Sequence, residues 1–350
     1  MRTLRILIVP LLSLAVMATH VRAQSQSLPV ALFERYLESL RQQAGIPGLS
    51  AAIIRNGQLE WDSGFGYQDV EAFVRATGDT PYPLLDLTQT LSSTVLLQQC
   101  MEQRYLDLSD RVRRWNSQFG EDNTTVAQLL SHKGAGGNFE YNTGRYAALT
   151  TVIDQCSSGR YARLITEEIL NRLGMTNSVP SHDLADGTPI RREFTNDERS
   201  RYVEILRRVA VPYKVTAGRA TRSDYFRPSL SSSSGIVSTV RDLARFDGAL
   251  DDDILLEAET RRRAWEAAGS VPTGLGWFVW FVQQSNNERI VWHSGFARDA
   301  YSALYIKVPS RKLTLILLAN SDGLAAPYTL ANGDITASLF AQLFLKLFLT

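Results

Sequence analysis

The chain holds few residues that could activate a nucleophile. A serine hydroxyl attacks an acyl group only when a base lies within hydrogen-bond reach, and a lysine one helical turn further on is one such base. The sequence contains five lysines, at positions 133, 214, 307, 312 and 346. The residues three positions before them are Leu130, Val211, Leu304, Pro309 and Leu343. No Ser-x-x-Lys motif therefore exists anywhere in the chain, and no Gly-x-Ser-x-Gly motif is present either.

The histidines and cysteines do not have the spacing of a metal site. After residue 23 the histidines are His132, His182 and His293, and the cysteines are Cys100 and Cys156. Because they form no cluster at ligand spacing, we expect no metal and no cofactor. Each cysteine lies in a segment with helical periodicity. In an oxidising compartment the two could form a disulfide, or both could be small buried apolar residues.

Composition restricts the class of protein. The 350 residues are 44% hydrophobic, and 37 Lys and Arg are balanced by 36 Asp and Glu, for a net charge of +1. This apolar fraction is enough for a sizeable core and excludes a disordered chain. The balanced charge, without any basic block, argues against nucleic acid as a partner.

The first 23 residues have the pattern of a secretory signal peptide. Arg2 and Arg5 precede an apolar run over residues 6–17, which is too short to span a membrane, and residues 21–23 (VRA) end in a small residue. We expect cleavage near Ala23 and a periplasmic or secreted mature chain without a transmembrane helix. The alternative is an uncleaved N-terminal anchor.

The order of elements predicts an α+β fold. A helical pattern over 32–43 is followed by apolar runs at 49–55 and 58–64, joined by Asn56-Gly57, the strongest short hairpin signal. Helical periodicity dominates 85–264, although 176–234 is expected to be mostly loop. Strands are expected at 275–282, 290–293, 302–308 and 313–319, and a last helix at 336–349.

Strands at both ends and helices between them are most simply joined in one antiparallel sheet. We expect a single domain over 24–350, in which the sheet subdomain comprises 24–84 and 265–350. Helices flank this sheet, and residues 85–264 form a helical subdomain.

Nine short segments follow one another in an order and at a spacing that resemble a known family. They are 45–48 (GIPG), 106–112 (LDLSDRV), 126–132 (VAQLLSH), 141–146 (YNTGRY), 173–175 (LGM), 234–245 (SGIVSTVRDLAR), 274–277 (GLGW), 293–295 (HSG) and 317–322 (LLANSD). Together they resemble the serine β-lactamase and penicillin-binding-protein superfamily, in its class C β-lactamase and esterase branch. The resemblance covers about residues 30–345 and implies a β-lactamase/transpeptidase-like fold.

The resemblance also implies three catalytic motifs, of which the first is missing. The family carries Ser-x-x-Lys at the start of a central helix, where the serine is the acyl nucleophile and the lysine helps to remove its proton. An ungapped count places Leu87 at the serine position and Thr90 at the lysine position. A shift of one residue gives Asp86 and Gln89 instead. Neither register supplies serine with lysine.

The other two motifs are kept in part. Tyr141 takes the tyrosine position of the family's Tyr-x-Asn motif, and Thr143 stands in place of the asparagine. His293, Ser294 and Gly295 take the place of the third motif, which lines the site on a strand. The resemblance thus implies that Tyr141 and His293 line a pocket or move a proton. Thr143, Ser294 and Gly295 are expected to bind substrate, with the glycine letting a ligand carbonyl approach the strand.

Two functions follow from this pattern. The first is an exported β-lactamase-related protein that is impaired or inactive as a serine acyl hydrolase and binds a small molecule or peptide in its cleft. The alternative is an active serine-hydrolase-like enzyme with a rearranged nucleophile, of the esterase, D-Ala-D-Ala peptidase or β-lactamase type. Whether the chain is an enzyme therefore depends on which groups lie beside Tyr141 and His293.

Overall fold

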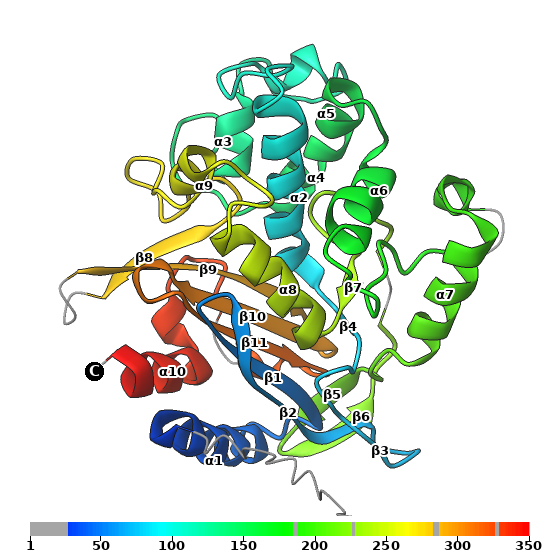
Figure 1. Ribbon diagram of the computed structural model, residues 1–350, viewed down its shortest axis with the longest axis vertical. Helices are drawn as coiled ribbons and strands as arrows, with labels where there is room; N and C mark the ends of the chain where they lie inside the picture. The colour runs from blue at the N-terminus through cyan, green and yellow to red at the C-terminus, as the bar shows by residue number, and fades with distance from the viewer. Residues whose placement is uncertain (1–26, 185–187, 226–227, 283–286, 326–328, 350) are drawn as a thin grey trace, which may run out of the picture.

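A seven-stranded antiparallel sheet forms the centre of the computed structural model, which describes residues 27–184, 188–225, 228–282, 287–325 and 329–349 (Figure 1). The strand order is β3-β2-β1-β11-β10-β9-β8, so the N-terminal hairpin lies beside the C-terminal strands. The strands are β1 (Gly48–Arg55), β2 (Gln58–Asp69), β3 (Val74–Arg75), β8 (Phe278–Val282), β9 (Glu288–Ala297), β10 (Tyr301–Val308) and β11 (Leu313–Ala319). The predicted α+β class and antiparallel sheet are confirmed. The predicted signal peptide lies outside the described residues.

The first hairpin forms as its turn residues predict. Asn56 and Gly57 have φ angles of 53° and 73°, which are the positive values that both central positions of a type I′ turn require. The turn aligns β2 with β1, and β1 then pairs with β11 from Leu49 opposite Ala319 to Arg55 opposite Leu313. This pairing closes the sheet between the two ends of the chain.

Both faces of the sheet are covered by apolar layers. Along β1, Ala51 and Ile53 belong to the cluster that α1 (Leu28–Gln43) and α10 (Leu339–Leu349) bury. The alternate residues Ala52 and Ile54 belong to a second cluster with the central helices and α8 (Val240–Asp251). Because successive side chains of a strand point to opposite faces, a strand buried on both sides is apolar throughout.

Residues between the two groups of strands are mainly helical and surround one buried helix. This helix, α2, is buried at every position and continues as a π-helical turn, Leu97–Met101. The helices of this region are α2 (Thr88–Leu96), α3 (Val126–Leu130), α4 (Thr143–Ala147), α5 (Leu149–Cys156), α6 (Tyr161–Leu164), α7 (Asn196–Arg207), α8 and α9 (Ala258–Ala264). The start of α2 lies against the sheet, which places it at the candidate site. None of the helices in the described ranges has both the length and the apolar character to cross a bilayer.

The expectation that 176–234 is mostly loop is wrong in two places. Helix α7 forms within it, and the hairpin of β5 (Tyr213–Thr216) and β6 (Arg219–Arg222) follows. Only Tyr202 and Ile205 of α7 are buried, so its apolar periodicity is weak. A further pair, β4 (Tyr82–Pro83) with β7 (Val237–Ser238), joins this region to the start of the central helix.

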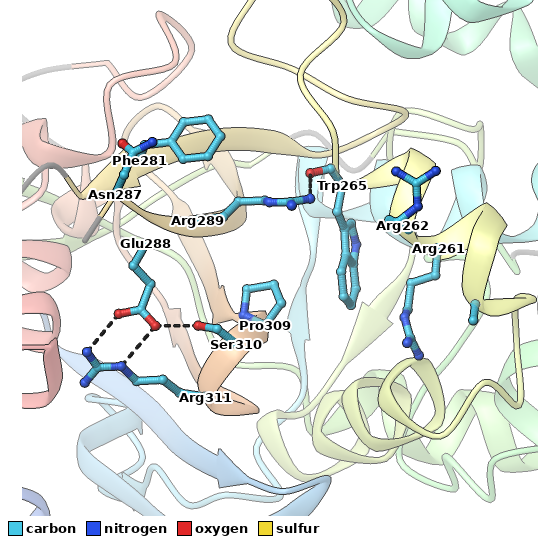
Figure 2. A pocket seen from close by; sticks show the side chains of 11 residues that line it. Arg261, Arg262, Trp265, Phe281, Asn287, Glu288, Arg289, Pro309, Ser310 and Arg311 are labelled. Atoms are coloured by element: carbon cyan, nitrogen blue, oxygen red, sulfur yellow. Dashed lines mark hydrogen bonds and ion pairs between the residues drawn. The ribbon is translucent and has the colours of Figure 1, made fainter. Parts of the chain in front are cut away.

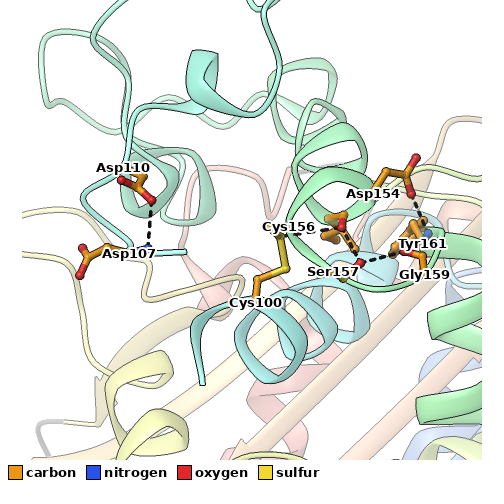
Figure 3. The surroundings of a disulfide bond; sticks show 9 residues. Cys100, Asp107, Asp110, Asp154, Cys156, Ser157, Gly159 and Tyr161 are labelled. Atoms are coloured by element: carbon orange, nitrogen blue, oxygen red, sulfur yellow. Dashed lines mark hydrogen bonds between the residues drawn. A yellow bond between two sulfur atoms is a disulfide. The ribbon is translucent and has the colours of Figure 1, made fainter. Parts of the chain in front are cut away.

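Cys100 and Cys156 form a disulfide, which decides between the two alternatives left open by the sequence (Figure 3). Their Cα atoms are 5.5 Å apart, and the bond joins the end of the central helix to the end of α5. The bond closes a segment of 56 residues.

Removal of this disulfide should destabilise the protein. In the chain-entropy treatment a closed segment of this length contributes about 4 kcal/mol, and measured losses are commonly about 2–5 kcal/mol. We expect the Cys100→Ala/Cys156→Ala variant to unfold at lower urea concentration than the parent, with a loss in that range. Parent protein kept in reductant should approach the variant. Equal urea midpoints for the oxidised parent and the variant would contradict the expectation.

Candidate functional site

The candidate site begins at a strained turn before the central helix. Leu85–Leu87 forms a 3-10 turn directly before α2, and Leu85 has a φ of 55°. A positive φ at a residue with a bulky side chain costs about 1–3 kcal/mol and persists only where its surroundings impose it. Here the strain turns the chain so that Asp86, which follows, is partly exposed between two buried leucines. Such strain is common at functional sites, which makes Asp86 the first residue to consider.

A chain of hydrogen bonds connects Asp86 to the loop before α4. The Tyr141 hydroxyl is hydrogen-bonded to the Asp86 carboxyl. The Gln89 amide nitrogen donates to the Tyr141 hydroxyl at 3.4 Å, and the Gln89 amide oxygen lies 2.8 Å from His132 Nε2. The backbone N–H of Asn142 donates to His132 Nδ1 at 3.4 Å, so Nε2 carries the proton that Gln89 accepts.

This geometry separates the two registers considered for the missing motif. Asp86 and Gln89 are the residues that reach Tyr141. Leu87 is fully buried in the core, and the Thr90 hydroxyl donates to the Leu87 carbonyl within the helix. The pair at the head of the central helix is therefore a carboxylic acid and an amide, three residues apart.

His293 completes the cluster from the sheet. It lies on β9, is 1% exposed, and its ring centroid is 6.4 Å from that of Tyr141 and 5.4 Å from that of Phe278. Its Nδ1 is 2.8 Å from the Ser294 carbonyl oxygen, which as an acceptor fixes the proton on Nδ1. The structure thus brings Tyr141 and His293 together, as the resemblance implies, while their roles remain predictions.

The three residues expected to bind substrate have less distinctive surroundings. Thr143 is the first residue of α4 and partly exposed, and Ser294 is buried on β9. Gly295 is required by packing, because a Cβ there would lie 2.3 Å from the Leu84 carbonyl oxygen and 2.9 Å from the Leu85 Cβ. The strand is thereby pressed against the turn that carries Asp86.

A side chain at position 295 should therefore displace that turn. We expect Gly295→Ala to lower the free energy of unfolding by about 1–3 kcal/mol, the usual cost of overpacking. Gly120→Ala is a matched control, because a Cβ there meets no atom within 4 Å. Urea unfolding of both variants tests this, and an equal effect of the two substitutions would show that the close approach is not required.

Charge at the site is concentrated on one group. Burial raises the pKa of Asp86 to about 7, and the hydrogen bond from Tyr141 opposes that rise only in part. Burial lowers the pKa of His132 to about 3 and the pKa of His293 to about 4. Burial also raises the pKa of the Tyr141 hydroxyl well above its ordinary value. At pH 7 both imidazoles and the phenol are neutral, and Asp86 alone titrates near neutrality.

No lysine replaces the missing amine, and all five lysines lie within the described residues. Lys307 is buried on β10, where its Nζ is 2.9 Å from both Asp247 and Asp251. Lys133 lines a cavity with Arg263 and Glu266 instead of facing Tyr141. The other three lie on β5, in the turn before β11 and on α10: Lys214, Lys312 and Lys346.

The raised pKa of Asp86 predicts a pH-dependent cost in stability. The unfolded carboxyl titrates near pH 4, so below that pH Asp86 is protonated in both states. Between pH 4 and 7 the folded state holds a proton that the unfolded state has lost, so this contribution to stability falls as pH rises. We expect Asp86→Asn to be more stable than the parent by about 1–3 kcal/mol at pH 8 and equal to it near pH 4. A less stable Asp86→Asn at pH 8 would indicate a structural carboxylate.

A separate cavity in the described part of the chain lies away from this cluster. It measures about 810 Å³ and is bounded by α9, β8, β9 and the turn after β10 (Figure 2). Three of its four arginines have carboxylate partners: Arg261 pairs with Asp253, Arg262 with Glu259 and Glu266, and Arg311 with Glu288. These pairs leave little net charge for a ligand, so this cavity is not the candidate site.

Sequence reasoning missed the part that His132 plays. The sequence assigned His132 no role, but its side chain is buried, its ring centroid is 4.3 Å from that of Tyr141, and its Nε2 lies 2.8 Å from the Gln89 amide oxygen. The positive φ of His132, 49°, turns it inward after α3. The sequence signal that could have indicated this role is the position of His132 at the end of the 126–132 segment, one of the nine segments that resemble the family.

Two curated proteins illustrate which sequences this chain is similar to. "Protein flp" of Staphylococcus aureus (strain N315) is 24% identical, over 82% of this chain and 62% of its own length. "Putative penicillin-binding protein PbpX" of Bacillus subtilis (strain 168) is 25% identical, over 68% of this chain and 63% of its own length. The chain thus spans less than two thirds of the length of these curated relatives.

Solved structures share the fold. The octameric penicillin-binding protein homologue from Pyrococcus abyssi has a TM-score of 0.69 at 21% identity, over 87% of this chain and 76% of its own. The D-amino acid amidase from Ochrobactrum anthropi SV3 has a TM-score of 0.67 at 17% identity, over 90% of this chain and 98% of its own. The Beta-lactamase family profile matches residues 33–338. The chain therefore belongs to the Beta-lactamase family.

Proposed function

We propose that this chain is an exported member of the β-lactamase family that forms no serine acyl-enzyme. In place of that chemistry it binds a small molecule or peptide non-covalently in the cleft beside Asp86, Tyr141 and His293. The observation that carries the proposal is the pair Asp86 and Gln89 at Tyr141, where the family has a hydroxyl and an amine. Loss of nucleophile and base together removes most of the rate of acyl transfer.

The groups present cannot readily replace that pair. The Gln89 amide nitrogen has no basic lone pair, so it cannot take a proton from a nucleophile. The Tyr141 phenol, with its pKa raised, is not a base at neutral pH. Three neighbouring hydroxyls are buried and donate to carbonyls of the preceding turn: Thr90 to Leu87, Ser92 to Thr88 and Ser93 to Thr90. The Thr88 hydroxyl is also buried and has no base within hydrogen-bond reach among the described residues.

Export is supported by two independent features. Residues 1–23 have the pattern of a secretory signal peptide, and a disulfide between Cys100 and Cys156 persists mainly in oxidising compartments. We therefore propose a periplasmic or secreted location. Fractionation of cells producing the full chain tests it: a cytoplasmic, uncleaved and reduced protein would contradict this part of the proposal.

Covalent labelling tests the central claim. The purified protein is incubated with a fluorescent penicillin and analysed by denaturing gel and by intact mass. We expect the unmodified mass, because no activated hydroxyl faces the cleft. A stoichiometric adduct mapped to Thr90, Ser92 or Ser93 would overturn the proposal and favour the alternative, an active hydrolase with a rearranged nucleophile.

Hydrolysis assays provide a second test of the proposed function. We expect no hydrolysis of p-nitrophenyl acetate or a chromogenic cephalosporin above the level of a mock purification. If hydrolysis is seen, the Thr90→Ala and Tyr141→Phe variants identify its source. A rate lost in either variant would establish catalysis in this cleft, whereas a rate unchanged in both would come from a contaminant and would leave the proposal standing.

A further inference from the structure

The carboxyl of Asp86 has fewer partners than Asp242 and Asp247, two buried carboxylates in the described part of the chain. Asp242 accepts from the Asn177 backbone N–H and from the Ser178 hydroxyl. Asp247 is bonded to Lys307 and to two hydroxyls. Asp86 receives one hydrogen bond, from Tyr141, among the described residues. A carboxylate offers about four acceptor sites, so most of those on Asp86 are left for a ligand.

Asp86 does not act as a helix cap. The first turn of α2 has no side-chain cap, and the turn Leu85–Leu87 has none either. Structural acids at a helix start normally accept one or more backbone N–H groups. Because Asp86 is not used in this way and follows the strained Leu85, fold stability gives no reason for an acid here.

Asp86 is the last acceptor in a series of hydrogen bonds. In this series each group donates to the next one: the Asn142 N–H to His132, His132 to Gln89, Gln89 to Tyr141, and Tyr141 to the Asp86 carboxyl. Every member before Asp86 is neutral at pH 7. This series of hydrogen bonds therefore ends on a single, partly exposed anion, and no cation of the described residues forms an ion pair with it.

We propose that the ligand of this site carries an ammonium group that pairs with the Asp86 carboxylate. An ammonium satisfies the open acceptor sites with charge-assisted hydrogen bonds, which are about twice as strong as neutral ones. The inference rests on the proposed function, since it assigns a chemical class to the non-covalently bound ligand.

The charged state of the site makes ammonium binding depend on pH. Tyr141, from the loop before α4, is the titratable group that contacts Asp86, and His132 from the turn after α3 and His293 from β9 lie behind it in the same cluster. Since the phenol and both imidazoles stay neutral above pH 5, the carboxyl alone changes charge. With a pKa of about 7, its ionised fraction, and hence the apparent affinity, falls roughly thirtyfold between pH 8 and pH 5.5.

Calorimetric titration with paired probes tests the proposal. The probes are benzylammonium and benzyl alcohol, which share the ring and differ in charge. We expect the parent to bind benzylammonium at least about tenfold more tightly than benzyl alcohol, an advantage equivalent to 1.4 kcal/mol. Asp86→Asn should lose that preference. Asp197→Asn, which removes an exposed acid on α7, should keep it and so excludes attraction to surface charge.

Each contrary result is decisive. Equal affinity for the two probes, no binding of benzylammonium, or an undiminished preference in folded Asp86→Asn would overturn the ammonium proposal. If Asp86→Asn fails to fold, the pH series on the parent decides, because affinity that is flat between pH 5.5 and pH 8 contradicts a role for Asp86. Penicillin labelling tests the proposed function independently of these titrations. An unlabelled protein without a preference for benzylammonium would contradict the ammonium proposal alone, whereas a labelled protein would contradict the proposed function.

Discussion

The double variant Asp86→Ser/Gln89→Lys should acquire covalent acylation by penicillin that the parent protein lacks. These two positions reach Tyr141 in the folded chain, and their spacing of three places both on one face of the helix start. A hydroxyl and an amine there would restore a nucleophile with its base. We expect acylation to become at least about a thousandfold faster, the scale on which such pairs act.

Single variants serve as controls for this gain. Asp86→Ser alone supplies a hydroxyl without a base, and Gln89→Lys alone supplies an amine without a hydroxyl, so both should remain close to the parent. The groups act as a unit, and their effects are not additive. The measurement is a time course of adduct formation by intact mass. A folded double variant that stays unlabelled would mean that the deficit lies elsewhere in the cleft, with Thr143 the first position to change.

Loss of the buried lysine should produce a large change in stability. Lys307 is inaccessible to solvent, and its Nζ lies 2.9 Å from one carboxylate oxygen of Asp247 and 2.9 Å from one of Asp251. Tyr305 and Thr314 also donate to Asp247, which links α8 to β10 and β11. Removing one member of a buried ion pair costs about 3–5 kcal/mol, because it leaves an uncompensated charge inside the protein.

We therefore expect Lys307→Ala to unfold with a free energy about 3–5 kcal/mol below that of the parent, measured by urea titration at pH 7. The matched control is Lys214→Ala. Lys214 pairs with Asp299 at 3.2 Å, but its side chain is 50% exposed. Exposed pairs contribute about 0–1 kcal/mol, so this variant should resemble the parent. Similar losses in the two variants would show that burial does not set the strength of the Lys307 cluster.

Local sequence patterns predicted the elements that are determined by interactions between neighbouring residues. Asn56-Gly57 specified the first hairpin, because the φ values of a type I′ turn depend on those two residues. Helical periodicity over 85–264 predicted helices between the two groups of strands, and α5 and α8 are among them. The periodicity of α7 was too weak, since two buried residues among twelve do not make a clear apolar stripe. Its capping box, Thr195 with Glu198, was the readable signal.

By itself the sequence determined the antiparallel α+β class, through apolar runs at both ends of the chain, and the absence of any Ser-x-x-Lys pair. It left two registers at the head of the central helix equally open, Asp86 with Gln89 and Leu87 with Thr90. Only the tertiary structure decided between them. The contacts that select Asp86 and Gln89 come from Tyr141 and His132, more than forty residues away. The turn that contains Leu85, whose φ is positive, packs closely against Gly295 of a distant strand. Spacing along a chain reports which residues share a helix face. Which of them meet a distant loop and strand depends on how those elements pack together.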